Sequence, residues 1–252
     1  GLNYRNSNSG SYTGQGVFNV NPNTISSASI GNSLTTQWVI ENVLTYDRTF
    51  GKHKINGTAL YSAEQTKFNS SYIQAKDIPS DAFQFYNLGH AQGEIIIDPA
   101  NQNYFKTGLV SWMGRAMYTY DNKYMITATV RSDAASVLAP GNQWHTYPAL
   151  SVGWNMTNES FLQDSNFINL LKLRAGYGET SNQAVSAYST LGRLSAVPYN
   201  FGDAGDSSYY IGNYVTQLPN PNLGWEYSET YNYGVDFSLF NKRLTGSAEY
   251  YV

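Results

Sequence analysis

The chain has 252 residues, a formal net charge of −3 and no cysteine, and only 13% of its residues are charged. The lack of cysteine excludes disulfides, a thiol nucleophile and a cysteine-based zinc site, and the slightly acidic balance argues against a nucleic-acid-binding protein. Aromatic residues make up 15% of the chain, with 22 Tyr and 22 Gly, which favours β-structure with many turns over disorder.

The first predicted strand pair follows a segment, residues 1–34, that carries no recognisable motif. Apolar side chains alternate with polar ones over residues 38–50 and 55–61, and Gly51-Lys52 makes a tight turn between them. A long connection is predicted at residues 67–108. Its longest aliphatic run, Ile95–Ile97, is too short for a membrane-spanning helix.

The clearest hairpin covers residues 112–120 and 123–131. On one face it places small, aliphatic and aromatic side chains, and on the other it places polar side chains and methionines. The pair Asp121-Asn122 separates the two strands, and both residue types tolerate the positive φ angles of a two-residue turn.

Four further segments repeat the alternation, so the sequence predicts about eight antiparallel strands in an all-β fold. These segments are residues 148–157, 170–179, 226–240 and 243–250. Each carries one apolar and one polar face. In a soluble sandwich the apolar face points inward, whereas in an outer-membrane barrel it points to lipid, and alternation alone does not distinguish the two.

The lengths of the connections favour a barrel. Turns near residues 50–53, 120–123 and 240–243 are short, the link at residues 158–169 is intermediate, and long connections fall at 67–108, 132–146 and 180–225. Membrane barrels have short periplasmic turns and long extracellular loops, with aromatic girdles at both interfaces. Aromatic residues near strand ends either fit such girdles or are ordinary core aromatics: Tyr46, Tyr118, Tyr120, Trp154 and Trp225.

The two ends of the chain predict a piece of a longer protein. The chain starts at Gly1 without an initiator Met, and it stops at Val252 within an alternating strand pattern. A strand that ends there leaves an unpaired edge, which natural domains avoid.

Several segments, in order, resemble the SusC/RagA-like TonB-linked outer-membrane transporters of Bacteroidetes. They include residues 114–136, the Ala139-Pro140-Gly141-Asn142-Gln143-Trp144 stretch and its continuation to Trp154, then 171–183, 220–226 and 232–247. Residues 35–65 fit more loosely. One departure is Arg131-Ser132-Asp133-Ala134-Ala135-Ser136, where the family usually has Arg-Arg-Asp-Gly-Ser-Ser. Because Ala resists positive φ, a different local turn is expected there.

The resemblance implies a transmembrane β-barrel of about 22 strands, closed by a separate plug domain. It also implies a SusD-like surface lipoprotein as partner, the TonB complex as energy source, and oligosaccharides or peptides as substrate. Residues 1–252 would form a partial barrel domain in the outer membrane, with the plug, the TonB box, the signal peptide and the last strands absent.

Two sets of residues are candidates for a functional role. Charged residues on the polar faces are expected to line the lumen and form charge networks: Arg115, Arg131, Lys172, Arg174, Asp236 and Glu249. Aromatic residues in the long connection at 184–222 are candidate contacts to substrate or to the lipoprotein lid, or else they pack on one another within an ordered loop: Tyr188, Tyr199, Phe201, Tyr209, Tyr210 and Tyr214.

Nothing in the sequence predicts a catalytic residue, a cofactor or a metal site. His53, His90 and His145 are scattered without ligand spacing, and no nucleophile-elbow motif occurs. The resemblance implies transport rather than catalysis: a TonB-energised nutrient importer in contact with outer-membrane lipid. The alternatives are a secreted β-sandwich carbohydrate-binding module and a small outer-membrane barrel adhesin.

Overall fold

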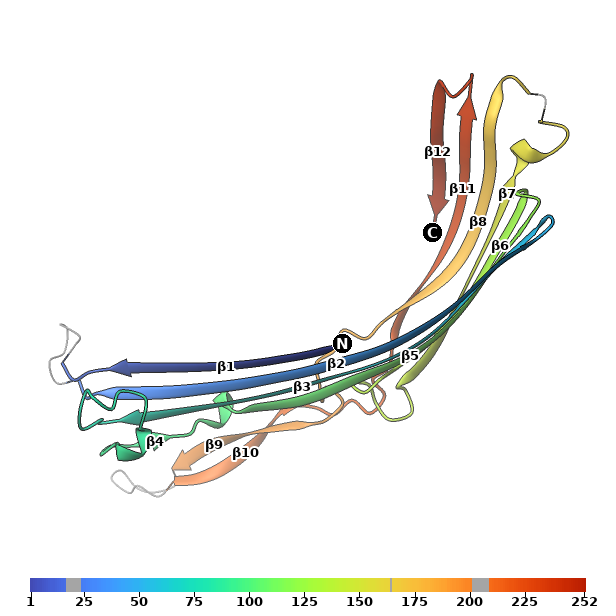
Figure 1. Ribbon diagram of the computed structural model, residues 1–252. Coiled ribbons are helices and arrows are strands. Elements are labelled where there is room, and N and C mark those ends of the chain that lie inside the picture. The colour runs from blue at the N-terminus through green and yellow to red at the C-terminus, as the bar shows by residue number, and fades with distance from the viewer. Residues whose placement is uncertain (17–23, 164, 201–208) are drawn as a thin grey trace. The chain divides into compact units, whose positions relative to one another are not determined.

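The computed structural model is an all-β protein, and it describes residues 1–16, 24–163, 165–200 and 209–252 (Figure 1). The strands within these ranges are β1 Leu2–Thr13, β2 Ser27–Phe50, β3 His53–Lys76, β4 Ile95–Ile96, β5 Asn103–Tyr120, β6 Tyr124–Ala135, β7 Trp144–Asn155, β8 Ile168–Asn182, β9 Arg193–Asn200, β10 Tyr209–Gln217, β11 Glu226–Leu239 and β12 Leu244–Tyr251. Three short 3₁₀ helices accompany them: η1 Leu88–His90, η2 Pro99–Asn101 and η3 Met156–Asn158.

One antiparallel sheet contains most of these strands. Its order is β1-β2-β3-β5-β6-β7-β8-β11-β12, with β4 paired to β3, while β9 and β10 form a separate hairpin. The eight predicted strands correspond to β2, β3, β5, β6, β7, β8, β11 and β12, so the all-β antiparallel class is confirmed. No helix in the described part of the chain is long and apolar enough to cross a membrane.

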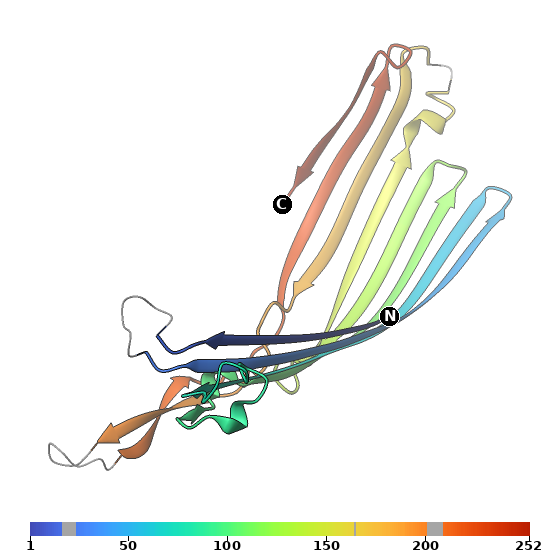
Figure 2. The same ribbon diagram turned by 60° about the vertical axis from the view of Figure 1, so that its left-hand side comes forward.

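The chain divides into two compact units, which we describe separately. Unit 2 comprises residues 41–63 and 109–252, and in it β6, β7, β8, β11 and β12 lie side by side (Figures 1 and 2). The tight turns have the expected backbone: φ is +51° and +52° at Asp121 and Asn122, and +56° at Gly51. The β11–β12 turn is similar, with Phe240, Asn241 and Lys242 all at positive φ.

The short connections of unit 2 contact one another in succession. The Asp121 N–H donates to the Lys52 carbonyl at 2.7 Å, and the Asn155 N–H donates to the Lys123 carbonyl at 2.7 Å. The Phe240 N–H then donates to the Phe167 carbonyl at 2.9 Å. These turns therefore share one end of the sheet, which we call the turn end, as the alternation of short and long connections predicts.

The connections at the other end of unit 2 are also fastened together. The Ala139 N–H donates to the Leu223 carbonyl at 3.0 Å, and the Trp225 indole donates to the Gln143 carbonyl at 2.9 Å. The predicted connection 132–146 is shorter than expected because β6 continues to Ala135 and β7 begins at Trp144. Ala134 is in strand conformation and is not among the residues with positive φ, so its replacement of the family's glycine does not strain the backbone.

Unit 1 comprises residues 1–40 and 64–108. Its β1 pairs with β2 from Leu2–Trp38 to Thr13–Ser27, which gives a structure to residues for which the sequence had predicted none. The single long connection expected at 67–108 is wrong at both ends, because β3 continues to Lys76 and β5 begins at Asn103. The remaining segment, 77–102, contributes to a small core of Ala28, Ala75, Ile78 and Leu88.

Candidate functional site: the two faces of the strand sheet

The first feature of the candidate site is a row of apolar side chains across unit 2. Register pairing places one residue from each of β5, β6, β7, β8, β11 and β12 on the same line and the same face: Tyr118, Ile126, Val152, Ala175, Tyr233 and Tyr250. Ile126 and Val152 are each 46% exposed, and Tyr233 is 53% exposed. A contiguous apolar surface of this kind indicates contact with another molecule or with lipid.

Aromatic side chains bound this apolar face at both ends. Tyr120, Tyr124 and Trp154 are paired across β5, β6 and β7 beside the turn end, and the Tyr124 and Trp154 rings stack at 6.5 Å. Trp112 lies eight residues before Tyr120 on β5. Eight strand residues span about 26 Å along the strand, and at the tilt of about 35–45° found in membrane barrels they rise about 20 Å, most of the apolar band of about 25 Å. Trp144 occupies the corresponding end of β7 and is 54% exposed.

The predicted girdle residues are distributed between the two ends. Tyr118, Tyr120 and Trp154 lie beside the turn end, and Tyr46 lies close to the Gly51 turn. Trp225 directly precedes β11 at the opposite end, where it contacts the 136–143 connection. Trp225 also lies 6.3 Å from the His145 ring, so it packs within that end, and the four predicted residues beside the turn end are the ones that fit an aromatic belt.

An ion-pair network crosses the polar face of β8, β11 and β12. Arg174 donates from Nε to Asp236 Oδ2 at 2.9 Å, and from Nη2 to Asp236 Oδ1 at 2.8 Å and Glu249 Oε1 at 2.7 Å. Gly234 is the register partner of both Arg174 and Glu249. A Cβ at Gly234 would lie 3.1 Å from the guanidinium carbon, so the glycine leaves room for the arginine to lie across β11.

The other predicted charges on the polar face do not join this network. The Arg115 side chain donates to Thr129 Oγ1 at 3.2 Å on the neighbouring strand. Lys172 is the register partner of Asp236 and lines a shallow hollow with Arg174, but it makes no ion pair within the described ranges. Of the six predicted charges, the structure therefore brings together Arg174, Asp236 and Glu249.

Arg131 belongs to a second network, near the 136–143 connection. Its Nε lies 3.0 Å from Asp133 Oδ1, its Nη2 lies 3.3 Å from Ser111 Oγ, and the Tyr147 hydroxyl donates to the same aspartate. Asp133 is only 5% exposed, so these donors compensate for the burial of its charge. Asp133 and Tyr147 were not among the residues predicted from the sequence, although Arg131 and Asp133, two residues apart, must share a strand face.

A cluster around His145 continues from this network and was also missed. His145 Nε2 lies 2.5 Å from Glu179 Oε1, and the imidazole stacks on Tyr147 and Tyr227 with ring centres 5.9 and 5.4 Å away. The contact joins residues 34 positions apart in the sequence. Only the strand register brings them together, so no local sequence signal could have indicated it.

A third network fixes the turn end. Glu159 accepts hydrogen bonds from the Tyr124 hydroxyl at 2.5 Å, the Lys123 ammonium at 3.1 Å and the Trp154 indole at 3.1 Å. These donors, led by Tyr124, lower the pKa of Glu159 to about 2. The carboxylate thus anchors the segment after β7 to the start of β6, and its role is structural.

Four of the six candidate aromatic contacts, Tyr199, Tyr209, Tyr210 and Tyr214, lie in a hairpin rather than an irregular loop, and Tyr188 precedes it. The hairpin pairs β9 with β10, from Asn200–Tyr209 to Arg193–Gln217, and Tyr199 and Tyr210 are register partners. Tyr214 is 54% exposed and Tyr188, at φ +63°, is 38% exposed. Tyr209 starts β10, and Phe201 lies outside the described residues.

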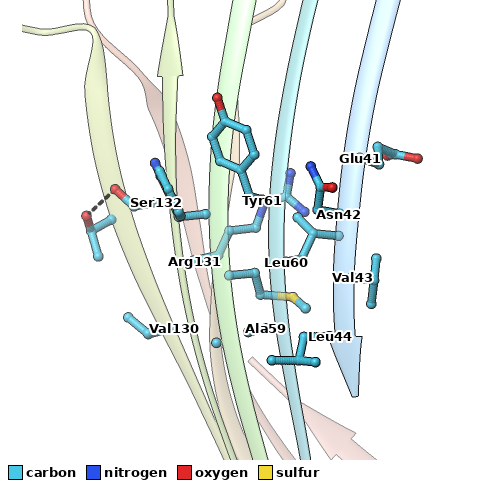
Figure 3. Close-up of a pocket in the computed structure, with 14 residues that line it drawn as sticks. Glu41, Asn42, Val43, Leu44, Ala59, Leu60, Tyr61, Val130, Arg131 and Ser132 are labelled. Carbon is cyan, nitrogen blue, oxygen red and sulfur yellow. Dashed lines mark hydrogen bonds between the residues drawn. The ribbon is translucent and has the colours of Figure 1, made fainter. Parts of the chain in front are cut away.

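A hollow of unit 2, about 740 Å³, lies over β2, β3, β5 and β6 (Figure 3). Leu44, Ala59 and Val130 line it together with Arg131, and Ser132 hydrogen bonds Thr146 at 2.8 Å beside it. No group of three or more metal-ligating side chains occurs in the described part of the chain.

Comparison with known proteins agrees with this geometry. The family model described as "TonB dependent receptor-like, beta-barrel" matches residues 1–252. TonB-dependent receptor P3 of Formosa agariphila is 35% identical over 217 residues, covering 86% of this chain and 21% of that protein. TonB-dependent receptor SusC of Bacteroides thetaiotaomicron is 39% identical over 151 residues, covering 57% of this chain and 14% of SusC.

A solved structure shows the same fold. The chain from "Structure of the RagAB peptide transporter" superposes with a TM-score of 0.72 at 22% identity, covering 99% of this chain and 27% of that chain. This chain therefore spans only about a quarter or less of each relative. The resemblance to SusC/RagA-like proteins is confirmed, and the chain belongs to the TonB-dependent receptor-like β-barrel family, whose barrels are outer-membrane proteins.

Proposed function

We propose that this chain forms part of the barrel wall of an outer-membrane, TonB-energised importer of oligosaccharides or peptides. The observation that carries the proposal is the exposed apolar row of unit 2, bounded by aromatic rows and backed by charge networks on the opposite face. Contact with lipid removes these apolar side chains from water, and it buries no unpaired polar group because the backbone is hydrogen bonded between strands. Contact with water would leave the apolar row exposed at a cost in free energy. A β-sandwich module would need a second sheet there, and none covers that face among the described strands.

The turn end faces the periplasm in this proposal, and the 136–143 and 183–225 connections face outward. Short periplasmic turns and long outer loops are the rule for membrane barrels. β2 and β3 each have 24 residues, whereas a tilted strand crosses the bilayer with about 9–11. Each of these two strands is therefore longer than one crossing of the bilayer requires.

The Arg174 and Arg131 networks face the lumen in this proposal, and the exposed Tyr188 and Tyr214 are offered to substrate or to a SusD-like lipoprotein over the outer opening. The plug and the TonB box belong to other parts of the protein. The wall supplies a passage, and movement of the plug, energised by the TonB complex, supplies the transport step. No bond of the substrate is broken.

The test is uptake by a strain that carries the full-length protein. Cells are given defined oligosaccharide and peptide mixtures, and depletion is compared among wild type, a deletion of this transporter and a deletion of the TonB component. We expect the protein in the outer-membrane fraction and one class of nutrient lost equally in both deletions. Uptake unchanged by either deletion, or protein in the soluble secreted fraction, would overturn the proposal.

A further inference from the structure

Unit 1 carries a polar hollow of its own. Its volume is about 520 Å³, within the range of ligand sites, about 300–1,000 Å³. β1, β2 and β3 and the end of η2 supply its lining. The lining residues are Ser7, Ser9, Gly31, Asn32, Ser33, Ser70, Ser71, Tyr72, Gln74 and Asn101.

The lining has no formal charge, and most of its polar groups are free. Ser9 hydroxyl donates weakly to the Gly31 carbonyl at 3.4 Å, and Asn101 donates to Asp98 at 3.0 Å. Within the described ranges, the side chains of Ser7, Ser33 and Ser70 have no protein hydrogen-bond partner. The hollow therefore presents short hydroxyl and amide groups that can both donate and accept.

The floor of the hollow is held in place from several sides. The small core of Ala28, Ala75, Ile78 and Leu88 packs in the same unit, and Ser26 exchanges hydrogen bonds with the backbone of Ile78. The Gln102 amide donates to the Tyr72 carbonyl at 2.7 Å, and Asp98 caps η2 through Ala100 N at 2.9 Å. Tyr72 and Asn101 are thus presented from fixed backbone.

Gly31 forms a notch in this floor. A Cβ at this position would lie 2.7 Å from Ser9 Oγ and 3.4 Å from the Tyr72 ring. The missing side chain leaves the edge of the Tyr72 ring and the Ser9 hydroxyl accessible together. An aromatic surface beside small hydroxyl groups suits a ligand that is apolar on one side and hydroxylated at its rim.

We propose that this hollow binds a neutral oligosaccharide, and the proposal rests on the importer function proposed above. Sugar hydroxyls both donate and accept, as the lining groups do, and a neutral ligand needs no opposite charge. A charged sugar or a charged peptide would lose hydration at this surface without gaining an ion pair. The hollow therefore selects for uncharged, hydroxyl-rich ligands.

The experiment measures binding to the full-length protein in detergent by calorimetry. The probes are three neutral hexasaccharides (maltohexaose, xylohexaose and laminarihexaose), an acidic oligoguluronate of equal length, and a decapeptide of Gly, Ser and Ala. The variants are Gly31→Val, which fills the notch, and Ser70→Asp, which adds a charge. The matched control is Asn69→Asp, since Asn69 is exposed, adjacent on β3 and outside the lining.

We expect at least one neutral hexasaccharide to bind, with affinity lower by about tenfold or more in Gly31→Val and Ser70→Asp and unchanged in Asn69→Asp. Tyr72→Phe should retain binding and Tyr72→Ala should lose it. Folding of each variant is checked by heat-dependent electrophoretic mobility. The inference is overturned if the wild-type protein binds none of the neutral hexasaccharides, whether or not it binds the peptide or the acidic sugar. The two proposals can fail independently. If uptake depends on TonB but both variants bind as well as wild type, the binding site is wrong and the importer function stands.

Discussion

Arg174 on β8 and Asp236 on β11 form a two-point ion pair, with N–O distances of 2.9 and 2.8 Å, although they lie 62 residues apart in the sequence. The pair is partly accessible, with side-chain exposures of 32% and 26%. Such a pair orients two strands more firmly than a single contact between flexible side chains.

Replacing Arg174 by Ala should lower the free energy of unfolding by about 1–2 kcal/mol, because two carboxylates then lose their common partner. Glu249→Gln should cost less, since Glu249 makes one contact and its side chain is 43% exposed. Urea unfolding of the full-length barrel in lipid vesicles measures both. Equal and negligible effects would show that the network contributes nothing to stability.

A charge on the apolar face should disturb assembly more than the same charge on the polar face. Leu150 is 50% exposed on the apolar face of β7, four residues from Trp154, and Ser151 follows it on the opposite face. Leu150→Arg should cost about 2–4 kcal/mol near the middle of the bilayer, and Ser151→Arg far less. The two variants are compared by the amount of folded barrel in the outer-membrane fraction, which is recognised by its heat-dependent electrophoretic mobility. A reversed order would exchange the lipid and lumen faces.

The Glu159 contacts predict a stability change at acid pH. A carboxylate whose pKa falls from 4.5 to about 2 on folding stabilises the folded state above about pH 4.5. This contribution declines as the pH falls from 4.5 towards 2. Denaturant unfolding at a series of pH values, monitored by the fluorescence of the adjacent Trp154, measures this change in stability. The Glu159→Gln variant should be less stable at neutral pH, and its stability should no longer change through protonation of residue 159 below pH 4.5. An unchanged dependence of stability on pH would show that other groups cause it.

The β5–β6 turn should reject β-branched residues. Asn122 has φ +52°, where a branched Cβ meets the backbone, so Asn122→Val should destabilise the hairpin by about 1–2 kcal/mol. Asn122→Gly is the control and should fold as well as wild type, because glycine adopts positive φ freely. Folded yield and unfolding midpoint are the measurements. Equal behaviour of the two variants would mean that the turn changes its backbone type.

The sequence was sufficient for the eight principal strands because alternation is strong where one face meets an apolar environment. The sequence did not predict how far β2 and β3 extend. In this part of β2 one face carries small polar residues such as Ser29, Gly31 and Ser33, and the difference in hydrophobicity between the two faces is small. The charge candidates were recognised by face alone. Which of them meet depends on register between distant strands, and the space for Arg174 depends on Gly234 of another strand. The local sequence pattern shows neither which charged residues meet nor where another strand leaves space for them.

The β9–β10 hairpin has a consequence for how the chain folds. β8 and β11 pair directly, yet the whole segment 183–225 lies between them, so their meeting requires closure of a long loop. The hairpin pairs Arg193 with Gln217 within that segment and can form from local contacts alone. Once formed, it shortens the flexible path between β8 and β11 and lowers the entropy cost of their pairing. A segment offered to ligand in the finished protein would thus also act as a folding aid, and its deletion should slow assembly of the wall.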